Sequence, residues 1–187
     1  AKRPALEQAI RKSGMPRPSF DRMETWAAAF MLLGNQFKAM GLKTGEGVET
    51  VLRTTFAGQG KAIAELESNR EQLAFFDALP EQAQRALLEG AIDEPKSMSK
   101  EFDRMVSSWA RGDVDDIART FNETMAASPE LREILLKRRN ENWNRWVQRR
   151  MAAPGSVMIA VGAGHLAGSD SLVDMLRRGG YTVRRVQ

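Results

Sequence analysis

Apolar residues recur along most of the chain every three or four positions, which is the spacing of amphipathic helices. Polar caps and prolines mark where some of these helices begin. Ser68 and Glu71 have the spacing of a capping box, and Ser128-Pro129 is typical of a helix start. The pattern predicts helices over residues 20–40, 48–56, 68–78, 81–92, 99–111, 114–125, 128–152 and 168–178.

Three short segments, 61–66, 157–161 and 181–186, lack this spacing and predict strands. Residues 157–161 form a mostly β-branched apolar run, as expected of a strand buried on both faces. Because the helix over 168–178 separates this run from 181–186, the three elements predict a right-handed βαβ unit with parallel strands. We therefore expect an α+β fold, mostly helical, with a small parallel sheet and a carboxyl-terminal βαβ unit. Residues 1–187 are expected to form a single domain.

The only histidine of the chain, His165, lies in a glycine-rich segment directly after the predicted strand 157–161. Parallel sheets bind ligands at the carboxyl ends of their strands, and Gly162 and Gly164 would let a substrate or a metal approach the backbone closely. The segment predicts a functional site in which His165 is a metal ligand or an acid/base group. The alternative is a structural histidine that only hydrogen-bonds within the protein.

Glu67 comes directly after the predicted strand 61–66, so a shared parallel sheet would place it at the same edge as His165. A carboxylate and an imidazole within reach of each other are what a divalent metal site or a general acid/base site requires. Alternatively, Glu67 serves only the start of the next helix, where an acidic residue interacts favourably with the helix dipole. Glu49 is either a further acid at this edge or an exposed residue of a helix start.

Arg139 and Asn140 lie about one turn before Trp143 in the predicted helix 128–152. On that face, Arg139 could bind a carboxylate of the protein or of a substrate through a bidentate pair. The four tryptophans have the spacing of helix residues that face a core, and we interpret them as core residues rather than as a binding platform. They are Trp26, Trp109, Trp143 and Trp146.

Six segments follow one another in an order that resembles the TraB/GumN family, which includes the TIKI proteins. They are Gly45-Glu-Gly47-Val48-Glu49, Leu66-Glu67-Ser68-x-x-x-Gln72-Leu73, Trp109-Ala-Arg-Gly112-Asp113, Arg139-Asn140-Glu-Asn-Trp143, Gly162-Ala-Gly-His165-Leu-Ala-Gly168 and Met175-Leu176-Arg-Arg-Gly-Gly180-Tyr181-Thr-Val183. The fifth is similar to the second of two Gly-x-x-His motifs in that family. The resemblance covers about residues 20 to 187.

The resemblance implies a bacterial, exported or periplasmic metal-dependent peptidase or hydrolase that acts on a peptide or protein. It implies that His165 and Glu67 are metal ligands and catalytic groups and that Arg139 and Asn140 position the substrate. The implied cofactor is a divalent metal ion. The family's first Gly-x-x-His motif and its acidic partner have no counterpart here. The chain is therefore expected to match the carboxyl-terminal two thirds of a family member and to bind metal weakly or not at all by itself.

The amino-acid composition excludes several classes of functional site. The chain has no cysteine, which excludes disulfides, thiolate metal ligands and a cysteine nucleophile. Residues 137–187 carry ten Lys or Arg against three acidic residues, but these cations alternate with apolar positions as on a solvated face. No nucleic-acid motif accompanies them, so we expect no nucleic-acid partner. No apolar run is long enough to span a membrane.

Three classes of function remain open at this stage. The first is the metal-dependent hydrolase or peptidase that the resemblance implies. The second is a noncatalytic protein-binding module in which the helical middle docks a partner. The third is a piece of a homo-oligomer, because an exposed strand edge invites pairing with another chain.

Overall fold

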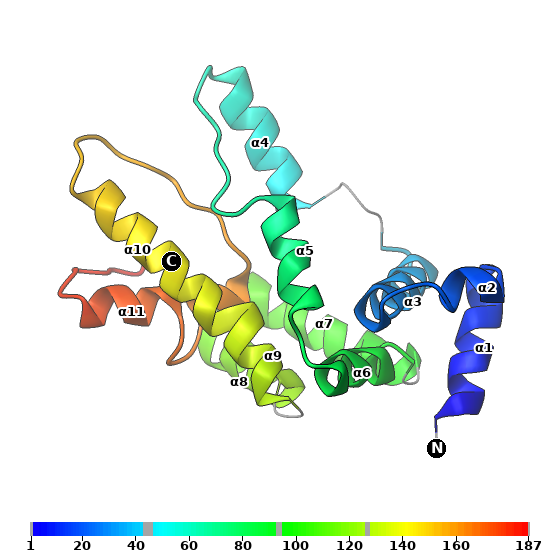
Figure 1. Ribbon diagram of the computed structural model, residues 1–187. Coiled ribbons are helices and arrows are strands. Elements are labelled where there is room, and N and C mark those ends of the chain that lie inside the picture. The colour runs from blue at the N-terminus through cyan, green and yellow to red at the C-terminus, as the bar shows by residue number, and fades with distance from the viewer. Residues whose placement is uncertain (1, 43–46, 93–94, 126–127, 187) are drawn as a thin grey trace. The chain divides into compact units, whose positions relative to one another are not determined.

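The computed structural model describes residues 2–42, 47–92, 95–125 and 128–186. The chain divides into two compact units, Ala1–Ser99 and Lys100–Gln187, and Figure 1 shows that each is built from helices. The description of residues 1–187 as a single domain stays a prediction. Within the described ranges, no helix combines the length and the apolar character that crossing a membrane requires.

The first unit packs its helices around α3. Its described helices are α1 (Arg3–Ser13), α2 (Arg17–Phe20), α3 (Thr25–Ala39), α4 (Val48–Gly58), α5 (Asn69–Asp77) and α6 (Glu81–Gly90). α3 packs against α6 and α1, and it buries the small residues Ala28 and Ala29 together with Leu32. Gly14, with a φ of 70°, takes the left-handed conformation that ends α1. Short side chains on α3 therefore allow close approach of the helices that cover it.

Polar and aromatic contacts complete this unit around Trp26. The buried Gln84 side chain accepts a hydrogen bond from the Trp26 backbone N–H (3.2 Å) and donates one to the Leu79 carbonyl (3.0 Å). The Trp26 ring stacks on Phe76, with 5.6 Å between ring centroids, and its Nε1 donates to Asp77 at 2.7 Å. These contacts attach the end of α5 and the start of α6 to the first turn of α3.

The second unit begins within α7 and is arranged around α10. Its elements are α7 (Pro95–Arg111), α8 (Val114–Met125), α9 (Pro129–Arg132), the π-helical turn η1 (Glu133–Lys137), α10 (Arg138–Met151), the 3-10 turn η2 (Ala163–Leu166) and α11 (Leu172–Arg178). α10 packs against α11, whereas η2 contacts both α8 and α11. One face of α10 is buried, and it consists of Asn140, Trp143 and Val147.

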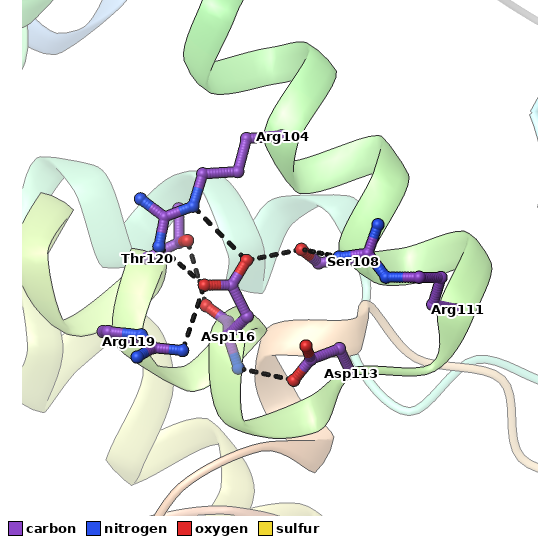
Figure 2. A network of polar contacts seen from close by, with 7 residues as sticks. All are labelled: Arg104, Ser108, Arg111, Asp113, Asp116, Arg119 and Thr120. Carbon is purple, nitrogen blue, oxygen red and sulfur yellow. Dashed lines mark hydrogen bonds and ion pairs between the residues drawn. The ribbon is translucent and has the colours of Figure 1, made fainter.

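A polar network joins α7 to α8 around Asp116 (Figure 2). This buried carboxylate accepts hydrogen bonds from Arg104 (2.6 and 3.3 Å), Arg119 (3.2 Å) and the Ser108 hydroxyl. Hydrogen bonds from Arg104 and Ser108 hold the pKa of Asp116 far below its ordinary value. Asp113 accepts from the Asp116 backbone N–H at 3.0 Å and so caps the first turn of α8. The network thereby fixes how α8 lies against α7.

The predicted α+β fold is wrong, because the described residues contain no strand. Residues 61–66, 157–161 and 181–186 have no regular secondary structure and belong to no strand. Val157 and Met158 are 46% and 57% exposed, so they do not lie in a buried sheet. β-branched runs favour extended backbone, but a strand also needs a neighbouring segment to satisfy its backbone groups. No strand is present among the described residues, so the predicted βαβ unit is absent.

The predicted helices are present, with differences at their ends. The helix expected over 20–40 is α3, which begins later, at Thr25, whereas α1 and α2 were not predicted. The helix expected over 128–152 contains η1, in which the Arg138 backbone N–H donates to the Glu133 carbonyl across a π turn. The last helix starts at Leu172, where the Ser171 hydroxyl caps it by accepting from the Asp174 backbone N–H.

Candidate functional site

The loop between α10 and α11 presents His165 in the 3-10 turn η2. The His165 backbone N–H donates to the Gly162 carbonyl at 2.9 Å, and this bond closes the turn. Gly164 is buried inside the turn. Gly168 leaves the turn with a φ of 83°, a conformation that favours glycine, and a side chain there would meet Ala118 of α8. The loop is therefore held against α8 on one side.

Asn140, which is fully buried on α10, contacts this loop at three points. Its Oδ1 lies 2.8 Å from His165 Nδ1, and its Nδ2 donates to the carbonyls of Asp170 (2.7 Å) and His165 (3.4 Å). Because two carbonyls accept from the amide nitrogen, the amide oxygen faces the imidazole. The Nδ1 atom must then carry the proton, and Nε2 carries the lone pair.

Trp143 covers one side of the imidazole. The ring centroids of Trp143 and His165 are 4.4 Å apart, and the Arg139 guanidinium lies over the Trp143 ring at 4.9 Å. Burial, with the positive charge of Arg139 as a second cause, lowers the pKa of His165 to about 4. His165 is therefore neutral at pH 7.

The helix that carries these residues is itself anchored at its start. The π turn η1 ends two residues before Arg139, and the Arg139 guanidinium donates to the Leu135 carbonyl in that turn at 3.3 Å. π turns change the angular register of the residues that follow and are frequent at functional sites. An ion pair between Arg132 and Asp170 (2.8 Å) holds the far end of the His165 loop to α9.

The structure brings several of the predicted site residues together in the second unit. His165 contacts both Gly162 and Asn140 through hydrogen bonds. Arg139 lies over the ring of Trp143, which in turn contacts the imidazole. Glu67 belongs to the first unit, where it is half-buried directly before the Ser68 capping box of α5. The sheet edge that was expected to join Glu67 to His165 is absent from the described residues, so that topological argument fails. The assignment of Glu67 as a ligand or base stays a prediction.

Sequence reasoning missed part of this site and misplaced one tryptophan. Trp143 is 5% exposed, as expected of a core residue, but its contact with the imidazole was not foreseen. Its position three residues after Asn140 places both on one helical face, which is the signal that could have suggested it. Trp109 was expected in the core and is 55% exposed.

Whether the site can hold a metal ion depends on how many ligand side chains lie together. Within the described residues, no group of three or more His, Asp or Glu side chains is arranged to hold a metal ion. The imidazole of His165 fits one ligand position, because its second nitrogen is fixed by Asn140 in the way that metal-bound histidines usually are. The described part of the chain therefore supplies one oriented ligand.

Comparisons with known proteins relate the whole chain to one family. Residues 1–185 match the model of the TraB/PrgY/gumN family. The chain is 28% identical over 172 residues to the uncharacterized protein YbaP of Escherichia coli (strain K12), and equally to that of Shigella flexneri. The match covers 92% of this chain and 63% of each relative, so the chain spans less than two thirds of their length. No solved structure matches it.

Proposed function

Because the chain belongs to the TraB/PrgY/gumN family, we propose that it contributes to a metal-dependent peptidase or hydrolase. In this proposal His165 is a metal ligand or the acid/base group, and Glu67 is a second ligand or base. Arg139 positions the substrate and the buried Asn140 positions the imidazole, while Gly162, at the exposed start of the turn, leaves room for the peptide backbone. The substrate class is a peptide or protein.

One observation carries the proposal, namely the 2.8 Å contact between Asn140 Oδ1 and His165 Nδ1. It fixes the imidazole as the Nδ1–H tautomer, so Nε2 offers a lone pair. Burial keeps His165 neutral at pH 7, with a pKa of about 4, and only neutral imidazole binds metal or accepts a proton. Asn140 thus acts as a positioning residue that presents one nitrogen in one orientation.

The remaining roles follow from the chemistry of the side chains. A bound divalent metal would polarise the scissile carbonyl and make an attacking water more acidic. The Arg139 guanidinium, which lies over Trp143, carries a permanent charge suited to a substrate carboxylate or a developing oxyanion. Catalytic zinc typically has three protein ligands. We therefore expect this chain to bind metal weakly by itself and a longer form, extended by an amino-terminal segment with a second Gly-x-x-His motif, to bind it tightly.

Metal titration at pH 7.5 tests the proposal. Zn²⁺ and Mn²⁺ are titrated into this chain, into the longer form, and into the longer form carrying His165→Ala. The expected result is stoichiometric binding by the longer form and its loss in the His165→Ala variant. Glu67→Ala should weaken binding, whereas the matched control Glu65→Ala, at an exposed position two residues earlier, should not.

Two outcomes of this titration contradict the proposal. If the longer form binds neither metal, the metal-dependent reaction is excluded. If His165→Ala retains the affinity of the unmodified protein, His165 is not a ligand. Peptide hydrolysis, followed by mass spectrometry with the metal-loaded longer form, then tests the reaction itself.

The alternative is a noncatalytic protein-binding or oligomerisation module, and α4 favours it. This helix buries none of its residues, and Val48 and Val51 are 51% and 63% exposed. Exposed apolar residues on one helix are typical of surfaces that another protein covers. Sedimentation at increasing protein concentration tests this alternative, since a mass that stays monomeric contradicts self-association through α4.

A further inference from the structure

A small apolar pocket lies in the second unit beside the turn that carries His165. Its volume is about 230 Å³, and its lining consists of Met105, Val106, Trp109, Ile117 and Ala163. The first three come from α7, Ile117 comes from α8, and Ala163 opens the turn η2. None of the described residues that line it is charged, so it suits an apolar group.

The pocket combines a buried floor with an open rim. Ile117 is 4% exposed, whereas Val106 and Trp109 are 45% and 55% exposed. An open, largely apolar concavity with an aromatic side chain at its rim is typical of ligand and peptide recognition sites. Trp109, which sequence reasoning assigned to a core, is thus available to contact a ligand.

The Asp116 network joins α7 and α8, the two helices that form the walls of the pocket. Ser108 directly precedes Trp109, and Asp116 directly precedes Ile117. The hydrogen bond from Ser108 to Asp116 therefore clamps α7 to α8 next to the residues that line the cavity, as Figure 2 shows. Binding to a shape fixed in this way loses less entropy than binding to a mobile surface.

The position of Ala163 connects the pocket to the candidate site. Ala163 lies two residues before His165, so their Cα atoms are at most about 7.6 Å apart. An extended peptide advances about 3.3–3.6 Å per residue. A substrate residue whose side chain fills the pocket therefore lies within a few residues' reach of His165.

The volume of the pocket limits the size of the group that it can bind. Pockets for drug-sized ligands have volumes of about 300–1,000 Å³, and an apolar cavity of about 150 Å³ binds benzene. At about 230 Å³ the pocket is too small for a whole ligand but large enough for one aliphatic or aromatic side chain. We propose that it is a specificity subsite for one large apolar residue, Leu, Met or Phe, of a peptide substrate near the cleaved bond. This inference rests on the proposed peptidase function.

Binding of amino-acid amides tests the subsite without catalysis. N-acetyl-leucine amide, N-acetyl-phenylalanine amide and N-acetyl-serine amide are titrated into the chain and into the longer form. NMR signals of the Trp109 indole and the Met105 methyl group report occupancy. The leucine and phenylalanine amides should shift both signals saturably, at least about tenfold more tightly than the serine amide, as an apolar pocket requires.

Matched variants separate the pocket from other apolar surface. Ala163→Leu fills the cavity and should abolish the shifts, whereas Ala160→Leu adds the same volume at an exposed position outside it. Val106→Asn, on the exposed rim, should also abolish them without altering the buried core. Met151→Ala, at a 60% exposed position elsewhere in the unit, should leave them unchanged.

The outcomes distinguish this inference from the proposed function. Equal affinity for the three amides, or unchanged binding in both Ala163→Leu and Val106→Asn, overturns the subsite. Peptide cleavage by the metal-loaded longer form with no preference for apolar residues overturns it as well. If the apolar amides bind in the pocket but no metal binds the longer form, the subsite stands as a peptide-binding site and the metallohydrolase proposal fails.

Discussion

Asn140 contacts both the side chain and the backbone of His165, although 25 residues separate them in the sequence. The amide oxygen of Asn140 accepts from the imidazole, and its nitrogen donates to the His165 carbonyl and to the Asp170 carbonyl. One buried side chain therefore sets the tautomer of the imidazole and the path of the loop that carries it. This arrangement makes the environment of His165 sensitive to small changes at Asn140.

Asn140→Asp should raise the pKa of His165. The substitution keeps the shape of the side chain but places a carboxylate next to Nδ1, and an adjacent opposite charge favours the protonated imidazole by about 1–3 pKa units. An NMR pH titration of the imidazole Hε1 signal measures the change. Asn142→Asp is the control, because it adds the same charge at an exposed position on the same helix. An unchanged pKa in Asn140→Asp would show that the two side chains are not in contact.

His165 should make stability depend on pH between about 4 and 6.5. Its pKa is about 4 in the folded protein and about 6.5 when unfolded, so the unfolded chain binds the proton more tightly. The contribution is complete above pH 6.5 and is lost as pH falls through this window, with an upper limit of about 3 kcal/mol. Urea unfolding of the unmodified chain and of His165→Gln across this range measures it. The other titrating groups contribute equally to both proteins, so the difference between their free energies of unfolding reports His165 alone. A difference that stays constant with pH would contradict the prediction.

The helices could be predicted because their signals are local. The Ser68 capping box forms as expected, with Ser68 Oγ accepting from the Glu71 backbone N–H and the Glu71 carboxylate accepting from that of Ser68. Ser128 likewise caps α9. Strand pairing is not local, and residues 157–161 have the composition of a strand without a partner beside them. The prediction of a sheet therefore failed, because a strand-like composition does not supply a second strand to pair with.

The candidate site, like the fold, could be predicted from the sequence only in part. The family resemblance is confirmed, and it directed attention to Asn140 and His165. Their mutual hydrogen bond depends on how the loop packs against α10 and α8, which no spacing in the sequence reveals. Trp109 has helical spacing, yet the face it occupies borders a pocket rather than the core. Periodicity identifies the apolar side of a helix, whereas the surface that covers it is set by tertiary packing.

Asp116→Ala should lower the free energy of unfolding by about 2 kcal/mol. The change leaves the buried Ser108 hydroxyl without its acceptor, while Arg104 and Arg119 are exposed enough to be rehydrated. Glu81→Ala is the matched control, because it removes an exposed ion pair with Arg85, which typically contributes less than about 1 kcal/mol. Urea unfolding measures both. Equal losses in the two variants would show that the network around Asp116 adds nothing beyond a surface ion pair.

Trp143→Phe should leave stability within about 1 kcal/mol of the unmodified chain. The Trp143 Nε1–H is buried and has no hydrogen-bond partner within the described structure, and an unpaired buried donor costs about 1–3 kcal/mol. Phenylalanine removes that donor and keeps an aromatic ring beside His165, which offsets the lost indole volume. Trp143→Ala removes the ring as well and should cost about 3–5 kcal/mol.

The pKa of His165 provides a second measurement on the same variants. Because burial is the main cause of its low pKa, Trp143→Phe should keep the value near 4 and Trp143→Ala should raise it toward 6.5. Trp146→Phe, at a partly exposed position on the same helix, is the control for the loss of an indole. A loss of more than about 3 kcal/mol in Trp143→Phe would contradict the unpaired donor, since removal of an unsatisfied group cannot destabilise the fold to that extent. A low His165 pKa in Trp143→Ala would show that packing other than the Trp143 ring shields the imidazole from water.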